Sequence, residues 1–187
     1  MNITQIIILV VAVIVVWAIF TYNRLITLRN RAKEAFSDID VQLKRRYNLI
    51  PNLVEAVKGY AQHERGVFVK VTEARANALS AEKSGNVKNM GKAENMLSQT
   101  LKSLFAVAEN YPQLKASANF MELQRELRDA EDKIQAARRF FNTTVMALNT
   151  MIQNFPAVFV AKSLGFKKEE FFEIEEEGQR VVPKVNF

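Results

Sequence analysis

Few side chains in this chain of 187 residues are suited to catalysis or metal binding. There is no cysteine, and His63 is the one histidine, so thiolate chemistry and histidine-based zinc sites have almost nothing to build from. His63-Glu64 matches the start of a helical zinc motif, but Val67 stands where the second histidine is needed. Gly-rich phosphate loops are missing, and no serine or threonine has a basic partner at a recognisable spacing. The sequence therefore predicts no enzyme activity, no metal site and no cofactor.

Polar residues are concentrated in the block from residue 40 to 54, which surrounds a proline. Pro51 has no backbone N–H and its ring clashes with the preceding turn, so we expect a kink or break in the helix there. We expect Tyr47 and Asn52 to satisfy the backbone groups that the proline frees. Pro51 would then fix a joint between two helices.

The basic cluster in this block, Lys44-Arg45-Arg46, has more than one interpretation. It can be a solvated face whose charges pair with acidic neighbours such as Asp38 and Asp40, or a docking patch for another subunit or protein. A structural hypothesis links the cluster to the proline joint. In that hypothesis Asp40, Arg45 and Arg46 form ion pairs across helices.

The element before this block is an apolar segment with fifteen uninterrupted apolar residues from Ile6 to Phe20. Eighteen helical residues span roughly 27 Å, close to the ~30 Å hydrocarbon thickness of a bilayer. A cleavable signal peptide needs small residues after the apolar run, and a buried core helix is rarely so evenly apolar. The sequence predicts a transmembrane anchor over residues 1–22.

The flanking charges predict how the anchor is oriented. No charged residue precedes Arg24, whereas seven basic residues lie between positions 24 and 46. The positive-inside rule then places the short N-terminus outside and the bulk of the chain in the cytoplasm. The net charge of +6 is better matched by acidic lipid headgroups beside the anchor than by nucleic acid.

Beyond the anchor, apolar residues recur every three to four positions, as in amphipathic helices. These stripes cover residues 25–50, 53–78, 90–108 and 120–152. We expect a turn at residues 84–86 and a short helix over 157–164 that ends at Gly165. Short connections between long helices predict an all-α, antiparallel up-and-down bundle of about four long helices over residues 23–166, continuous with the transmembrane helix.

The tail, residues 167–187, is acidic and apolar, and two interpretations stay open. It is either a solvated terminus pinned to the bundle by Phe171 and Phe172, or an extended segment that adds to a neighbouring protein. In the second case Phe187 is one of its apolar anchors.

The block from residue 40 to 54, followed by Val57-Lys58-Gly59-Tyr60-Ala61, resembles the signature of the LemA family of bacterial membrane proteins. The resemblance continues through Glu109-Asn110-Tyr111-Pro112 and Gly165-Phe166 and covers nearly the whole chain. It implies one N-terminal transmembrane helix and a cytoplasmic helical bundle at the bacterial inner membrane, with no catalytic residues to carry over. A magnetosome-forming relative is linked to membrane shaping, and family members are found alongside membrane metalloproteases of the HtpX type.

We therefore expect a non-enzymatic, membrane-anchored helical scaffold that self-assembles as a homo-oligomer at the inner membrane, in membrane organisation or envelope homeostasis. The alternative is an adaptor that presents its bundle or tail to a membrane metalloprotease or another envelope protein of the stress response. The lipid bilayer is a partner in both cases.

Overall fold

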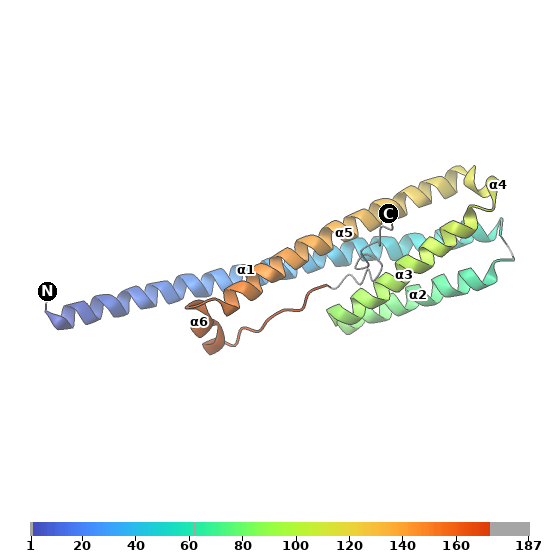
Figure 1. The fold of residues 1–187 in the computed structure, drawn as a ribbon. Coiled ribbons are helices and arrows are strands. Elements are labelled where there is room, and N and C mark those ends of the chain that lie inside the picture. Colours follow the sequence, from blue (N-terminus) through green and yellow to red (C-terminus); the bar gives the residue numbers. More distant parts are fainter. Residues whose placement is uncertain (1, 62, 173–187) are drawn as a thin grey trace, which may run out of the picture. The chain divides into compact units, whose positions relative to one another are not determined.

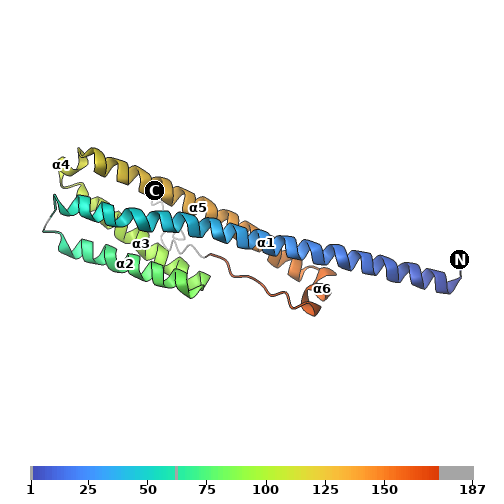
Figure 2. The same ribbon diagram turned by 180° about the vertical axis from the view of Figure 1, so that it is seen from behind.

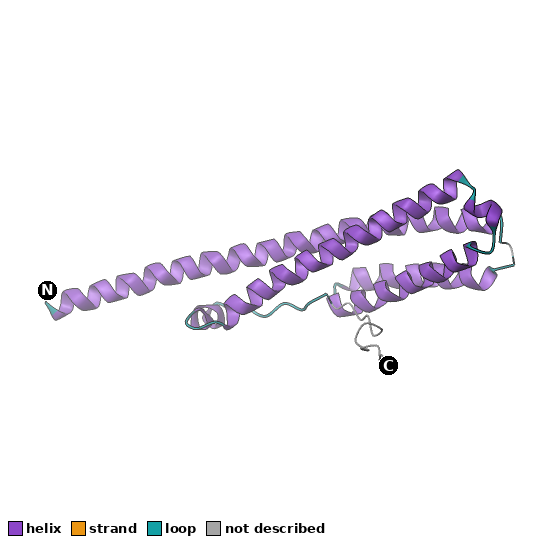
Figure 3. Cartoon of the chain, turned by 45° about the horizontal axis from the view of Figure 1, so that its top comes forward, coloured by secondary structure: helices purple, strands orange, loops and turns teal. Residues whose placement is uncertain are grey.

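The computed structural model describes residues 2–61 and 63–172, and all regular structure in these two ranges is helical (Figure 3). The prediction of an all-α chain is confirmed. The helices described are α1 (Ile3–Lys58), α2 (Arg65–Ser84), α3 (Val87–Ala108), α4 (Pro112–Lys115), α5 (Ala118–Gln153) and α6 (Ala157–Ser163). The chain divides into two compact units. Unit 1 contains Met1–Asp40 and Gln135–Phe171, and unit 2 contains Val41–Ile134 and the residues from Phe172 onward.

Helix α1 is 56 residues long, and its first part is apolar on every side. An 18-residue window of this helix has a mean hydropathy of 3.0 and none of it is buried. Water solvates such a surface poorly, whereas lipid accepts it and the helix satisfies its own backbone groups. Within the described residues, α1 alone passes as a membrane-spanning helix, and α5 with α6 passes only as a pair bent by 96°. These findings support a membrane protein; its orientation and the type of membrane stay predictions.

Unit 1 is held together by apolar contacts between α1, α5 and α6. Phe36 of α1 meets Phe141 of α5 with ring centroids 5.7 Å apart. Further along, one buried cluster contains Leu25, Leu28, Leu148, Ile152 and Ala161. Lower-numbered residues of α1 thus meet higher-numbered residues of α5. These two segments therefore run in opposite directions.

In unit 2, α2 and α3 lie side by side (Figures 1 and 2). The predicted turn between them is confirmed: Gly85 has a φ of 68°, which glycine adopts without strain. The side chain of Asn86 then accepts a hydrogen bond from the Asn89 N–H at 2.9 Å and caps α3. The predicted short helix near residue 157 is also present, and Gly165 after it has a φ of 71°.

The break predicted at Pro51 is wrong. Helix α1 continues through this proline to Lys58, and the next helix begins at Arg65 instead of near Leu53. Each of these segments is helical as expected, but the boundary lies further along the chain. The up-and-down arrangement of the whole bundle stays a prediction.

Candidate functional site

Three consecutive basic residues of α1 contact three different helices in unit 2. Side chains of successive helical residues point about 100° apart, so a run of three can reach neighbours on several sides. Lys44 lies 3.9 Å from Glu82 of α2. Arg45 bonds to α5, and Arg46 bonds to both α3 and α5. The basic cluster is therefore where α1 is joined to the other helices of this unit.

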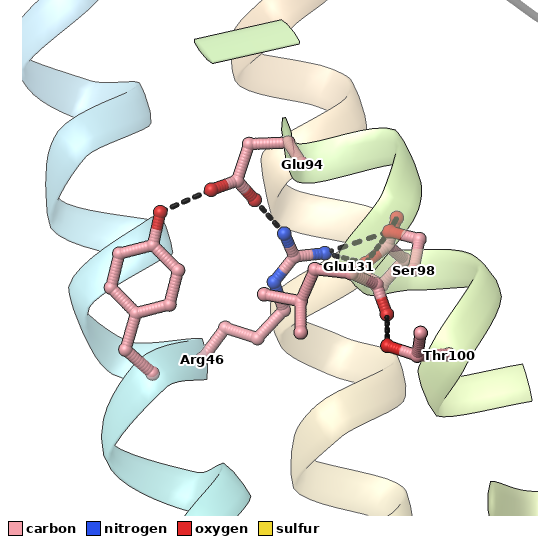
Figure 4. Close-up of polar contacts among 7 residues, drawn as sticks. Arg46, Glu94, Ser98, Thr100 and Glu131 are labelled. Atoms are coloured by element: carbon pink, nitrogen blue, oxygen red, sulfur yellow. Dashed lines mark hydrogen bonds and ion pairs between the residues drawn. The ribbon is translucent and has the colours of Figure 1, made fainter. Parts of the chain in front are cut away.

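Arg46 is the centre of this junction and has no solvent exposure (Figure 4). One terminal nitrogen, Nη2, donates to Oε2 of Glu94, whose side chain is also fully buried. The other, Nη1, donates to Oε2 of Glu131 at 2.5 Å and to Oγ of Ser98 at 2.9 Å. The hydroxyl of Tyr47 donates to the second oxygen of Glu94. The network thus ties α1 to α3 through fully buried groups and to α5 through Glu131, whose side chain is 31% exposed.

The chemistry of this network favours a structural role. Ser98 donates to Oε1 of Glu131 at 3.2 Å, which resembles a nucleophile beside a base. However, the same serine oxygen accepts a hydrogen bond from the Arg46 cation, which lowers its nucleophilicity. Glu94 is held between Arg46 and Tyr47 with no access for a substrate. The polar side chains of this network form hydrogen bonds with one another, and the arrangement is a helix junction.

Arg45, the neighbour of Arg46, makes a different kind of contact. It is about one-third exposed and donates to Asp129 at 2.6 Å and to Glu126 at 2.5 Å, both on α5. Hydrogen bonds from Lys133 and Arg45 lower the pKa of the Asp129 carboxyl, and those to Glu126 and Asp129 raise the pKa of Arg45. The pair is fully ionised at neutral pH. Because it faces solvent, its contribution to stability is small.

The reason why α1 is not broken at Pro51 lies on α2. In a regular helix the carbonyl of Tyr47 would accept from the N–H of residue 51, which a proline lacks. The Nε of Arg75 donates to this carbonyl at 2.8 Å instead. Our expectation for Tyr47 and Asn52 was therefore wrong: Tyr47 supplies the freed acceptor, while Pro51 and Asn52 are exposed.

A double-mutant cycle tests this substitution of a side-chain donor for a backbone donor. We expect Arg75→Met to lower the free energy of unfolding by about 1–3 kcal/mol, because the Tyr47 carbonyl loses its partner. In a Pro51→Ala background the N–H of residue 51 can serve that carbonyl, so the same change should cost less. Denaturant unfolding of the detergent-solubilised chain, followed by circular dichroism, measures both. Equal costs in the two backgrounds would contradict the assignment.

The remaining predictions for this site have mixed outcomes. The expected ion pairs across helices are present for Arg45 and Arg46, and the solvated-face interpretation is wrong for Arg46 because it is buried. Asp40 is half-buried and belongs to unit 1. Phe187 lies outside the described residues. Within the described ranges no group of three or more His, Cys, Asp or Glu residues could hold a metal ion.

Glu94, the buried acid of the junction, was not among the predicted site residues. The sequence nevertheless indicates that it is buried, because it lies within the apolar stripe of α3, between Met90 and Leu97. A carboxylate at a core position implies a buried cation, and a charged residue is almost never fully buried without one.

A family model described as "LemA family" matches residues 35–187. Magnetosome protein MamQ of Magnetospirillum gryphiswaldense is 26% identical over 174 residues, which cover 81% of this chain and 64% of the relative. Magnetosome protein MamQ 1 of Paramagnetospirillum magneticum is 25% identical over 175 residues, with the same 81% and 64% coverage. Protein LemA of Metamycoplasma hominis is 26% identical over 156 residues, covering 82% and 69%. The chain thus spans about 64% of the length of the MamQ relatives.

Proposed function

The chain belongs to the LemA family, and we propose that it is a non-enzymatic, membrane-anchored helical scaffold that assembles with copies of itself. The observation that carries this proposal is the fully buried contact between Arg46 and Glu94. The most distinctive block of the sequence fastens helices together and presents no open site for a ligand. The same helix, α1, contains both this junction and the apolar anchor.

Exposed apolar side chains support self-assembly. Phe140 of α5 is 57% exposed, whereas its neighbour Phe141 packs against Phe36 in unit 1. Met146, further along α5, is 56% exposed. Apolar side chains left at the surface of a helix beyond the membrane segment are typical of protein contacts. We propose that the exposed side of α5 at Phe140 meets another copy of the chain, with the long helices arranged as an antiparallel up-and-down bundle.

The location follows from the same features. Exposed basic residues follow the apolar part of α1, beginning with Arg24 and Arg29. The proposal is therefore a single-pass protein of the inner membrane with its N-terminus outside. The relatives named magnetosome proteins support a structural role at a membrane, in membrane organisation or envelope homeostasis.

The mass of the detergent-purified full-length protein tests the scaffold. We expect multi-angle light scattering, with the detergent subtracted, to give a discrete assembly of many copies. Phe140→Ser should reduce that assembly, because it removes an exposed apolar contact on α5. Val69→Ser, at a similarly exposed position of α2, is the matched control that should leave it unchanged. A monomer or dimer of the unaltered protein would reject the scaffold of many copies.

An adaptor is the second candidate, and the exposure of Phe140 and Met146 supports it equally well. In this case the exposed face or the C-terminal tail binds a membrane metalloprotease or another envelope protein. A monomeric or dimeric particle would favour the adaptor. Because the chain has no cysteine, a single Phe140→Cys variant would then carry a crosslinker at a defined position.

A further inference from the structure

Two phenylalanines, Phe155 just before α6 and Phe159 within it, form an exposed aromatic pair. Phe155 is 81% exposed and Phe159 is 66% exposed, and their rings meet edge to face with centroids 5.9 Å apart. Leu164, 53% exposed, follows on the same short segment. The inner face of α6 is already used, since Ala157 and Ala161 are buried. The aromatic pair, Phe155 and Phe159, therefore projects from a segment that is fixed to unit 1.

The contacts between α1 and α5 indicate which part of α1 lies near this aromatic pair. Phe141 of α5 packs against Phe36 of α1. Ile152, later in α5, packs in one cluster with Leu25, which is earlier in α1. The chain thus approaches the apolar end of α1 as α5 proceeds. Phe155 follows the end of α5, Gln153, by two residues.

A second contact places the segment after α6 at the same level. The rings of Tyr22 and Phe166 meet with centroids 6.3 Å apart. Tyr22 is two residues beyond Phe20, where the apolar run ends, which is about 3 Å along a helix. The interfacial layer on each side of the hydrocarbon is about 5–7 Å thick. The same segment also packs against Leu25 and Leu28, and the guanidinium of Arg29 lies 5.3 Å from the Phe166 ring. If α1 spans the bilayer, the segment around α6 therefore lies beside the outer edge of this layer, within reach of its longer side chains.

The direction and charge of α6 fit the same layer. Helix α6 is bent by 96° from α5, and α5 packs along α1 in this unit. Helix α6 therefore runs roughly perpendicular to α1, which is along the membrane plane if α1 spans the bilayer. The exposed lysines of this segment are Lys162, Lys167 and Lys168; no acidic residue occurs between positions 154 and 168, and the exposed Glu169 and Glu170 follow. Aromatic rings combined with lysines are the composition of interfacial membrane segments that contact anionic lipids.

We propose that α6 is an interfacial membrane contact: the aromatic pair inserts into the bilayer that α1 spans, and the three lysines bind anionic lipid headgroups. This gives the chain a second attachment point, which fixes the rotation of α1 about its own axis. The inference rests on the membrane anchor of the proposed function and is independent of self-assembly. A second protein copy is less suited to this position, because the level and the charge both match the headgroup layer.

Single cysteine variants test the inference in the full chain, which has no cysteine of its own. Phe159→Cys, Val69→Cys and Val13→Cys each receive a nitroxide label in vesicles of phosphatidylcholine and phosphatidylglycerol at low protein density. Collision rates with oxygen and with a water-soluble nickel chelate report whether the label lies in lipid or in water. Val69 is the control, because it is exposed on α2 and lies outside the proposed contact between copies. We expect the ratio of oxygen to nickel collisions to be several-fold higher at position 159 than at 69.

The outcomes separate this inference from the proposed function. Equal ratios at positions 159 and 69, with a lipid-like ratio at 13, would overturn the interfacial contact and leave the anchor intact. A water-like ratio at 13 would overturn both. A second copy would instead shield position 159 from both reagents, and the nitroxide spectrum would broaden as protein density rises. This result would show that position 159 contacts protein and would overturn lipid contact.

Neutral lipids test the role of the lysines. With phosphatidylcholine alone, the ratio at position 159 should fall relative to vesicles that contain phosphatidylglycerol. In a chain that also carries Lys162→Gln, Lys167→Gln and Lys168→Gln, this difference between the two lipid compositions should be lost. A difference that persists in the triple variant would reject headgroup binding by these lysines.

Discussion

Replacement of Arg46 by alanine is expected to lower the free energy of unfolding by about 3–5 kcal/mol. The fully buried Glu94 would lose its cation, and an uncompensated charge away from water is strongly unfavourable. Glu131 and Ser98 would lose the same donor. Denaturant unfolding of the detergent-solubilised chain, followed by helical circular dichroism, measures the change.

Arg45→Ala is a closely matched control, because the same side chain is removed from the next position of the same helix. We expect it to cost much less than Arg46→Ala, because a solvent-facing ion pair contributes little to stability. Arg45 is partly exposed, and Asp129 retains its hydrogen bond from Lys133 at 2.9 Å. Similar costs for the two arginines would show that burial does not distinguish them and would contradict the helix junction.

The double variant Arg46→Met, Glu94→Leu distinguishes a lost charge pair from lost packing. It removes both buried charges and fills their volume with apolar atoms, so it should be less destabilising than Arg46→Ala alone. A cost at least as large would mean that hydrogen bonds with Tyr47, Ser98 and Glu131 contribute most of the junction's stability.

The helix content of this chain could be predicted because it depends on local patterns. The apolar run before Arg24 and the stripes beyond it produced the expected helices. Gly85 and Gly165 end helices with positive φ, as a residue without a Cβ does most readily. Such features are decided by a few adjacent residues, so a single sequence is sufficient to find them.

The break at Pro51 could not be predicted correctly, because its outcome depends on a residue far away. The donor to the Tyr47 carbonyl is Arg75, 28 positions later in the chain. The partners of Arg46 are even more distant, since Glu94 and Glu131 follow it by 48 and 85 positions. The sequence indicated which residues carry charge, but only tertiary packing decided that Arg46 is buried and Arg45 is not.

The start of the C-terminal tail shows the same dependence on distant partners. Phe171 and Phe172 are equivalent in the sequence, yet Phe172 is fully buried and Phe171 is 43% exposed. The side chain of Asn149 on α5 exchanges two hydrogen bonds with the backbone of Glu169, both at 2.9 Å. The interpretation of a pinned terminus is thus supported at Phe172, while the alternative anchor Phe187 lies outside the described residues.

We expect Phe172→Ala to lower the free energy of unfolding by about 3–5 kcal/mol, the usual cost of removing a fully buried phenylalanine. Phe171→Ala, the adjacent control, should cost less than about 1 kcal/mol because much of its ring already contacts solvent. The same unfolding measurement in detergent compares them. Similar small effects would mean that the chain around residue 172 is not part of the folded core. A large effect confined to Phe172 would establish that the structural core extends past residue 166, so that the tail begins as a docked segment.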